Sequence, residues 1–494
     1  MKSGEEKAMI TNYSEQTTPH MSWVTESQLE RIHLASLEVL ERTGTRVDNR
    51  RALKLLKEAG CLVRGNVVRI PSALVEECIK TAPKKITLGN RNGDRDITLA
   101  KNRSYFGTGS DLPFIYDVEK GIRRYASLAD VEQAVRILEA LDNYNFIMTY
   151  VGAKELPEKT SELYLFKTML ANSFKPIIFT ANNTGNTEAI IEMAALAVGG
   201  LENLRMSPLM VLYSEPISPL IHSEEGIGKM MKCHEYGVPV VYTPGMLSGA
   251  TGPMTKAGTI TLMNAEALAG VVISQLNVKH SPIIIGGGCF PMDMKNSTSL
   301  YGCPEGQMNF GIMTQLSRFY GIPNFTEAGC TNAPVPDPQA GFEAGVSILM
   351  NQLTGANLIH DIGYLEGGKT GCLPFLAMCN DYIGYARYME QGTTINEETL
   401  AVETIDKTGI GNEYLSQEHT FKHFKHEIWQ PQFLNRMMWE TWEAKGRQSY
   451  IDVHLEAVKD ILSRGNQAPL SNDVMAGLDA IISERESKSH VKSF

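Results

Sequence analysis

The strongest constraint on the fold is a regular alternation of short apolar runs with longer amphipathic stretches. The apolar runs are rich in β-branched and aromatic residues and lie at residues 104–109, 145–152, 176–181, 209–215, 238–243, 282–287, 324–329 and 357–363. Helical patterns separate them at about 127–142, 160–173, 186–199, 222–236, 258–277, 305–319 and 339–354. Continuous apolar runs are typical of buried parallel strands, and eight strands joined by seven helices predict a closed (β/α)8 TIM barrel rather than a doubly wound sheet.

The regions on either side of this alternation have helical patterns. Residues 24–83 begin with a capping box formed by Thr25 and Gln28, and the pattern from Leu373 onward is again helical. We therefore expect an α/β protein with three parts: a helical or extended N-terminal segment over 1–100, a barrel catalytic domain over 101–372 and a C-terminal helical extension over 373–494. The extension is expected to pack outside the barrel or between subunits, which favours a homo-oligomer.

Composition excludes several classes of partner. The 494 residues carry a net charge of −10 and contain no run rich in Lys or Arg, which argues against nucleic acid and anionic membranes. Residues 1–18 are polar and mixed in charge, so neither a signal peptide nor a membrane span is expected. The eight cysteines form no CxxC motif, which favours a reducing cytoplasm.

The strand ends are rich in carboxylates and rings and poor in cations. Active sites of such barrels lie at the C-terminal ends of the strands. The carboxylates there are Glu215, Asp293, Glu327, Asp337, Asp361 and Glu366, and the rings are Tyr105, Phe106, Tyr150, Tyr213, Tyr242, Phe290 and Tyr364. Ring faces attract a quaternary ammonium group, which cannot donate hydrogen bonds. The alternative for any single ring is that it packs in the barrel core.

Metal and nucleophile chemistry are weaker alternatives. His360 and Asp361 are neighbours in a strand and should point to opposite faces, which argues against a shared ion. His419 and His423, or His423 with Glu427, have helical spacing that could clamp zinc, but this pattern is more typical of a solvated helix face. A catalytic thiol at Cys330 with His360 as its base is a further, minor alternative. No metal site is predicted.

Two glycine-rich segments follow the fifth and sixth strands. The segment SGATGP spans residues 248–253, and GGG spans residues 286–288. Glycine allows backbone N–H groups to approach a phosphate or a large planar cofactor closely, although no GxGxxG or GxxxxGK[ST] motif is present.

Three long motifs resemble the trimethylamine methyltransferase family. They are LSGATGPMTKAGTITLMNAEALAGVVISQ (247–275), GTGSDLP (107–113) and AGCTNAPVPDPQAGFEAG (328–345), and the resemblance extends through nearly the whole chain. It implies a (β/α)8 barrel that moves a methyl group from an amine to the Co(I) of a separate corrinoid protein docked at the barrel mouth. Cobalamin would be supplied by that partner, with no cofactor held tightly by this chain.

The loop GCTNAPVPD (329–337) departs from the family pattern. Archetypal members carry pyrrolysine there, at a position that corresponds to residues 332–334, whereas this chain has standard residues. Relatives without pyrrolysine include glycine betaine methyltransferases. A quaternary amine leaves as a neutral amine and needs no activating adduct, so the enzyme has only to position the methyl group and exclude water. The resemblance therefore implies a quaternary amine substrate, glycine betaine above others.

These inferences assign roles to fourteen residues. Those expected at the substrate are Tyr105, Phe106, Tyr213 and Tyr364 as a ring cage, Asn332 and His360 as donors to a carboxylate, and Glu215, Glu327 and Asp337 as catalytic carboxylates that supply the field at the cation. Those expected at the corrinoid-facing rim are Gly249, Gly252, Gly286, Gly287 and Gly288. Two alternatives from other classes remain: a noncatalytic betaine-binding barrel, and a barrel methyltransferase or lyase that uses a pterin.

Overall fold

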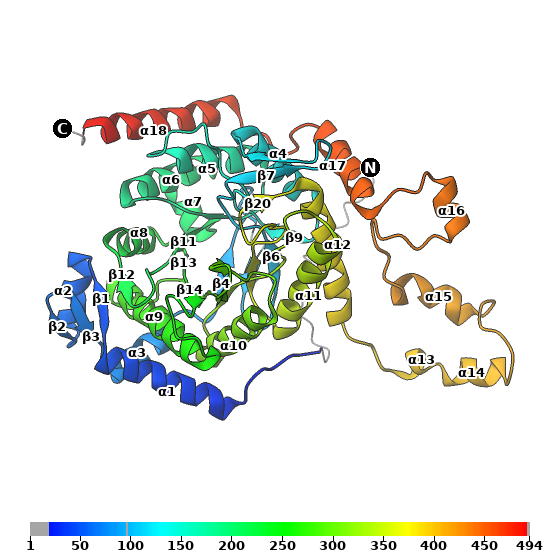
Figure 1. Cartoon of the computed structure of the whole chain (residues 1–494), viewed down its shortest axis with the longest axis horizontal. Helices are drawn as coiled ribbons and strands as arrows, with labels where there is room; N and C mark the ends of the chain where they lie inside the picture. The colour runs from blue at the N-terminus through cyan, green and yellow to red at the C-terminus, as the bar shows by residue number, and fades with distance from the viewer. Residues whose placement is uncertain (1–18, 95–96, 492–494) are drawn as a thin grey trace.

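A computed structural model describes residues 19–94 and 97–491, and its centre is a barrel of eight parallel strands (Figure 1). The strands are β6 (Tyr105–Gly107), β9 (Tyr144–Phe146), β10 (Ile177–Phe179), β11 (Met210–Ser214), β13 (Val240–Tyr242), β15 (Ile283–Gly286), β18 (Asn324–Glu327) and β19 (Leu358–His360). They pair in chain order, and β19 pairs in parallel with β6. A parallel bridge between Ile147 and Ile177 joins β9 to β10 and closes the barrel. Each strand falls in one of the eight predicted runs, although β9 begins one residue earlier.

Eight helices form a ring around this barrel. They are α4 (Leu128–Ala140), α5 (Ser161–Asn172), α6 (Thr184–Ala197), α8 (Glu224–Glu235), α9 (Lys256–Asn277), α10 (Pro304–Tyr320), α11 (Pro338–Thr354) and α12 (Leu373–Glu390). Each packs on the next, and α12 packs on both α11 and α4, which closes the ring. The (β/α)8 prediction is confirmed, and the eighth helix is the first helix of the segment that the sequence placed in the C-terminal extension.

The end of the barrel where the strands begin is closed by a hairpin. Strands β4 (Ile86–Leu88) and β5 (Ile97–Leu99) pair antiparallel, and their apolar side chains are buried. They form one cluster with the inward-facing side chains of all eight barrel strands, which include Tyr105, Val211, Phe325 and Leu358. The barrel is therefore filled at this end, and its other end carries the strand C-termini.

The N-terminal region contains strands as well as helices. Helices α1 (Glu26–Arg42), α2 (Arg50–Glu58) and α3 (Ser72–Thr81) occupy the region expected to be helical, and the predicted capping box of Thr25 and Gln28 is present. Strands β1 (Thr45–Val47), β2 (Leu62–Arg64) and β3 (Val67–Arg69) join β12 (Ile221–His222) in a small sheet. The polar segment 1–18, from which the absence of a signal peptide was predicted, lies outside the described residues.

Two small sheets stand around the C-terminal ends of the barrel strands. Strands β14 (Gly245–Ser248) and β16 (Gly288–Asp293) follow β13 and β15 and pair in parallel, and β17 (Thr298–Ser299) pairs antiparallel with β16. Strands β7 (Phe114–Asp117), β8 (Ile122–Tyr125) and β20 (Thr370–Gly371) form the other sheet. Both sheets lie in the connections that follow barrel strands, so they shape the barrel mouth.

The chain after α12 leaves the barrel and returns to it. Helices α13 (Glu397–Leu400), α14 (Val402–Thr408), α15 (Glu418–Glu427) and α16 (Trp439–Ala444) project to one side (Figure 1). Helix α17 (Tyr450–Ser463) packs on α12 and α4, and α18 (Asn472–Val491) packs on α6 and α5, whereas the short helix α7 (Leu201–Met206) follows α6. Helix α9 has the length and hydropathy of a membrane span, but it is mostly buried among the helices around it and is a core helix of the barrel.

Candidate functional site

Successive side chains of the barrel strands face inward and outward in turn, and this alternation directs three polar side chains into the barrel interior near the C-terminal ends of the strands. Val211 and Tyr213 belong to the interior cluster, so Glu215, two residues further, faces the same way. By the same alternation Phe325 leads to Glu327 on β18, and Leu358 leads to His360 on β19. The C-terminal ends of three different strands therefore place two carboxylates and an imidazole together at the mouth, which is where TIM barrels perform chemistry.

Asp361 joins these residues through an unusual backbone conformation. It follows the last residue of β19 and has a φ of 64°, which turns its side chain back toward that of His360. His360 Nδ1 consequently lies 2.6 Å from Asp361 Oδ1. The expectation that these neighbours point to opposite faces is wrong here, because Asp361 is no longer part of the strand.

A fourth carboxylate comes from the loop after β6. Asp111 has a φ of 67°, and its two oxygens accept hydrogen bonds from the hydroxyls of Thr149 at 3.3 Å and Thr180 at 3.2 Å. Asp111 and Asp361 both lie close enough to Tyr364 to raise the pKa of that phenol, which burial raises most. We refer to Asp111, Glu215, Glu327, His360 and Asp361 as the mouth cluster.

Aromatic rings surround the mouth cluster. The ring of Phe325 stacks on His360 with 3.9 Å between centroids, and the Tyr213 ring lies 5.6 Å from Phe325 and 6.2 Å from His360. The Tyr213 hydroxyl donates to Glu215 Oε2 at 3.1 Å. Tyr364 donates to the carbonyl of Ser110 at 3.0 Å. The surface beside the carboxylates is therefore composed of ring faces and edges.

Tyr301 adds a further ring from the segment before α10. It stacks on Phe290 with centroids 4.1 Å apart, and burial together with Glu327 and Asp361 raises its pKa well above the usual value. Its position brings the connection after β15 close to Glu327 and Asp361.

Three glycines allow the carboxylates to pack against backbone. A Cβ at Gly288 would lie 1.9 Å from Glu327 Oε1, and a Cβ at Gly109 would lie 1.7 Å from Asp361 Oδ1. A Cβ at Gly245 would approach Glu215 Oε2 to 3.0 Å. These positions exclude larger residues because the mouth cluster occupies the space.

The mouth cluster holds more negative charge than the surrounding cations balance. Burial raises the pKa of Glu327 well above its usual range, and the neighbouring Asp361 and Glu215 raise it further. Burial also raises the pKa of Glu215 and Asp111, although both side chains remain accessible to solvent. Lys229 is the nearby ammonium, and it donates to the carbonyl of Ala181 at 2.5 Å. A bound cation would relieve the repulsion among these carboxylates.

Among the described residues, the buried Glu327 Oε2 has no hydrogen-bond partner. The buried His360 Nδ1 has the close Asp361 oxygen beside it, but that contact does not have hydrogen-bond geometry. Ligand atoms of Glu327, His360 and Asp361 all lie within 4.8 Å of one another, a separation that could suit a metal. However, two ligands of one zinc ion at about 2.1 Å stand roughly 3.4 Å apart, and the 2.6 Å between His360 and Asp361 is too short for that arrangement.

The structure does not bring Tyr105 and Phe106 to the mouth. Tyr105 begins β6 and points into the interior layer below the mouth, where its hydroxyl donates to the carbonyl of Thr98 at 3.2 Å. Phe106 points outward, is fully buried beneath the helices and lies 5.5 Å from the guanidinium of Arg387. Both rings pack in the core, and we withdraw them from the expected cage.

Asn332 and Asp337 are also used elsewhere. Asn332 donates to the carbonyl of Ser299 at 3.0 Å and accepts from the Gly302 N–H at 2.9 Å, so its amide holds two loops together. Asp337 is the N-cap of α11 and accepts from the Ala340 N–H at 3.0 Å. The expected roles of Asn332 as a carboxylate donor and of Asp337 as a catalytic residue are therefore replaced by structural ones.

The five glycines expected at the rim have different surroundings. Gly288 lies against the Glu327 carboxylate of the mouth cluster, and the other four fall into two groups. Gly249 and Gly252 lie in the turn after β14, at the tip of the small sheet that extends beyond the barrel. Gly286 and Gly287 have φ values of 144° and 128°, and a Cβ on them would lie 2.1 Å from the Phe325 carbonyl oxygen and 2.6 Å from that of Pro244. Packing and backbone conformation account for this second group, whereas the first remains a prediction for the corrinoid-facing rim.

The minor alternatives do not build a site. Cys330 Sγ donates to the carbonyl of Asp361, and burial raises its pKa well above the usual value, which disfavours a reactive thiolate. His419 and His423 lie in α15, with ring centroids 4.3 Å apart, far along the chain from the mouth cluster.

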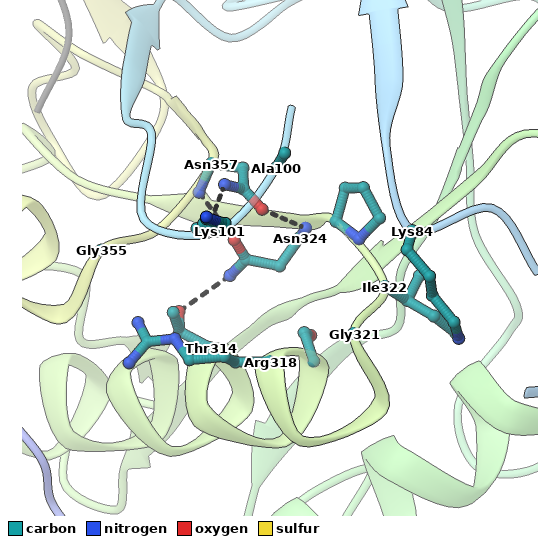
Figure 2. A pocket seen from close by; sticks show the side chains of 12 residues that line it. Lys84, Ala100, Lys101, Thr314, Arg318, Gly321, Ile322, Asn324, Gly355 and Asn357 are labelled. Atoms are coloured by element: carbon teal, nitrogen blue, oxygen red, sulfur yellow. Dashed lines mark hydrogen bonds between the residues drawn. The ribbon is translucent and has the colours of Figure 1, made fainter. Parts of the chain in front are cut away.

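A pocket at the opposite end of the barrel is lined by polar side chains that hydrogen-bond to other residues of the chain. About 250 Å³ in volume, it is lined by Lys84, Lys101, Arg318, Asn324 and Asn357 among others (Figure 2). The two asparagines bond each other's backbone, the Lys84 ammonium donates to two carbonyls, and Figure 2 shows Lys84 and Arg318 directed away from one another. Its cations do not converge, so the mouth cluster is the candidate site.

Sequence reasoning left Asp111, Asp361, Tyr301 and Phe325 out of the assigned set. Phe325 could have been found, because it alternates with Glu327 along one strand. The positions of the Asp111 and Asp361 side chains depend on positive φ values, which residue type alone does not predict.

Comparisons with known proteins agree on one family. Residues 1–489 match the family described as trimethylamine methyltransferase (MTTB). A trimethylamine methyltransferase of Desulfitobacterium hafniense is 31% identical over 93% of both chains, and a glycine betaine methyltransferase of the same species is 29% identical over 95% of this chain and 98% of its own. The solved monomethylamine methyltransferase of Methanosarcina barkeri shares the fold, with a TM-score of 0.51 and 12% identity over 90% of this chain and 89% of its own.

Proposed function

Because the chain belongs to the trimethylamine methyltransferase family, whose members work with separate corrinoid proteins, we propose that it demethylates a quaternary amine. The two relatives from Desulfitobacterium hafniense differ in the substrate that their names give and are almost equally similar to this chain. The identity of the amine must therefore be argued from the site.

The observation that carries the proposal is the excess of negative charge beside aromatic rings. The mouth cluster holds four carboxylates and one imidazole, and the rings of Tyr213, Phe325 and Tyr364 lie next to them. A quaternary ammonium supplies a permanent positive charge and presents only methyl groups, which pack on ring faces. Such a ligand would lower the repulsion that raises the pKa of Glu327.

The loop after β18 supports a substrate that needs no covalent activation. The family resemblance places the pyrrolysine position at residues 332–334, which in this chain are Asn332, Ala333 and Pro334. Ala333 is fully buried, and Asn332 bonds Ser299 and Gly302. No long side chain extends from these three residues into the mouth. A tertiary amine is a poor methyl donor without activation, whereas a quaternary amine leaves as a neutral molecule.

Positioning is the main task of this chain's residues. The carboxylates and rings would hold the ammonium head so that one N–methyl bond points out of the mouth, and the buried walls would exclude water. His360 is the mouth residue suited to interact with a substrate carboxylate, as glycine betaine would require. We propose glycine betaine as the first substrate to test.

The methyl acceptor is supplied by the partner. A corrinoid protein provides Co(I), a strong nucleophile toward the methyl group, at the open end of the barrel. The tip of the β14–β16 sheet, with Gly249 and Gly252, is the proposed contact surface. A cytoplasmic location and the absence of a tightly held cofactor remain our predictions.

A methyl-transfer screen tests the function. The purified chain and the reduced corrinoid protein are mixed with one amine at a time, and the absorbance change from Co(I) to methyl-Co(III) is followed. The amines are glycine betaine, proline betaine, carnitine, γ-butyrobetaine, choline and trimethylamine. Turnover with at least one quaternary amine and none with trimethylamine is expected. Turnover with trimethylamine alone would overturn the quaternary amine proposal and leave the family activity intact.

The two alternatives have their own outcomes. A noncatalytic binding barrel would bind a betaine in calorimetry and transfer no methyl group to any Co(I) acceptor. A barrel that uses a pterin would transfer a methyl group from methyltetrahydropterin and show no affinity for quaternary amines.

A further inference from the structure

The segment between α12 and α17 has almost no core of its own. Residues 391–449, here called the arm, carry helices α13 to α16, and Thr408 is the single buried residue among them. None of the four helices packs closely along another described helix or strand. Exposed polar contacts such as that of Glu398 with Lys422 join α13 to α15. Residues 427–433 tie the arm to α12 of its own chain, since Tyr388 donates to the Glu427 carbonyl at 2.6 Å and the Phe433 N–H donates to Asp381 at 3.2 Å.

The arm nevertheless exposes many large apolar side chains. They are Ile395, Leu400, Val402, Ile405, Ile410, Tyr414, Leu415, Phe421, Phe424, Ile428, Met437, Met438 and Trp439. Ile410 is 103% exposed and Leu415 87%. Taking roughly 200 Å² for a whole large side chain, the thirteen present roughly 1,600 Å² to solvent. A standard protein interface needs about 800 Å² from each partner.

A second exposed apolar surface lies on the body of the same chain. Phe342 and Val346 share one face of α11, and Tyr385 and Met389 share one face of α12, each pair four residues apart. All four side chains are between 42% and 70% exposed. We call these four residues the receiving face. The arm projects beyond this side of the barrel (Figure 1), and although its Trp429 ring lies 5.5 Å from that of Tyr385, all four side chains of the receiving face stay exposed.

The position of the arm separates it from the mouth. Helix α12 begins beside the mouth, where the Cys372 N–H bonds Tyr150, and like every helix of the barrel it runs back toward the end where the strands begin. The arm leaves from that far end of α12. A corrinoid protein that reaches the mouth cluster therefore does not need the arm.

We propose that the arm of one copy packs on the receiving face of a second copy of this chain. Exchange of identical elements about a twofold axis covers both surfaces on both copies, and symmetric pairing of this kind is the commonest form of protein association. The arm is then an interface element whose apolar side chains find their core in the partner.

Oligomeric state and cross-linking test the proposal. The full-length wild type is expected to sediment as a dimer or a multiple of it at micromolar concentration. The variant I410D/L415D/F421D and the receiving-face variant F342D/M389D are each expected to shift the dissociation constant upward by at least 100-fold. The matched control L34D/V67D/M206D removes exposed apolar side chains elsewhere on the body and should leave assembly unchanged.

A cysteine experiment keeps the proposal testable if an aspartate variant misfolds. Chains carrying L415C are mixed with chains carrying M389C under mild oxidation, and disulfides between different chains are expected. A monomeric wild type, an arm variant that assembles normally, dissociation of the control, or a disulfide confined to single chains of the double variant L415C/M389C would each overturn the proposal.

Discussion

Replacing Glu327 by Gln should weaken cation binding and remove a linked proton release. The substitution keeps the shape of the side chain and removes one charge from the mouth cluster. With its methyl groups in contact, an ammonium nitrogen stands about 5 Å from a carboxylate oxygen, so their attraction at an effective dielectric of 20 is about 3 kcal/mol. Burial, Asp361 and Glu215 raise the pKa of Glu327 and so favour its neutral form, which makes the gain smaller than this full Coulomb attraction. We expect affinity to fall about 10- to 100-fold.

Calorimetry with tetramethylammonium and with glycine betaine measures both effects. In buffers of different ionisation enthalpy, the wild type should release protons on binding, since the cation lowers the pKa of Glu327. The E327Q variant should release fewer. The control E305Q removes the same charge at the exposed start of α10. An affinity within twofold of wild type, with unchanged proton release, would refute the assignment of Glu327 to the cation site.

Three further outcomes follow from the same geometry. Because the folded protein holds the Glu327 proton above the usual pKa of 4.5, the stability of the ligand-free wild type should fall as pH rises from there through the raised pKa, and thermal melts of E327Q should show a flatter profile. The variant G288A places a Cβ 1.9 Å from Glu327 Oε1, so it should weaken cation binding in calorimetry while circular dichroism stays native; unchanged affinity would contradict that contact. The variant D337A removes the α11 cap and should cost about 1 kcal/mol of unfolding free energy in denaturant titrations. Its dissociation constant for the amine should equal that of the wild type, and a large loss of binding would restore the catalytic role first expected for Asp337.

The sequence predicted the barrel because its strands are short, apolar and evenly separated. Each strand of the barrel lies in a predicted run, since fully buried parallel strands have no polar positions to interrupt the pattern. The hairpin that closes the barrel was not predicted. Its residues Ile86, Leu88, Ile97 and Leu99 alternate over only three positions per strand, which is too short for a clear period.

The site was predicted in part, and the errors have several causes. Tyr213, Glu327 and His360 lie on strands and Glu215 directly follows one, so alternation fixes the direction that they face. Tyr105 and Phe106 also lie on a strand, but Tyr105 faces the interior layer below the mouth and Phe106 faces outward beneath the helices. Asn332 and Asp337 lie in a loop, where the partner that a polar side chain finds is decided by tertiary packing. The pairing of His360 with Asp361 depends on one backbone dihedral that residue type does not determine.

The hairpin of β4 and β5 imposes an order of binding on the proposed reaction. The amine and the methyl acceptor both have to approach the mouth cluster from the C-terminal ends of the strands. The other end of the barrel is filled by Ile86, Leu88, Ile97 and Leu99. A partner protein bound at the mouth blocks both entry of the amine and release of the demethylated product. The amine then has to arrive first, and the demethylated product has to wait for the partner to leave. An excess of free partner protein should consequently lower the turnover rate, where simple saturation would bring that rate to a plateau.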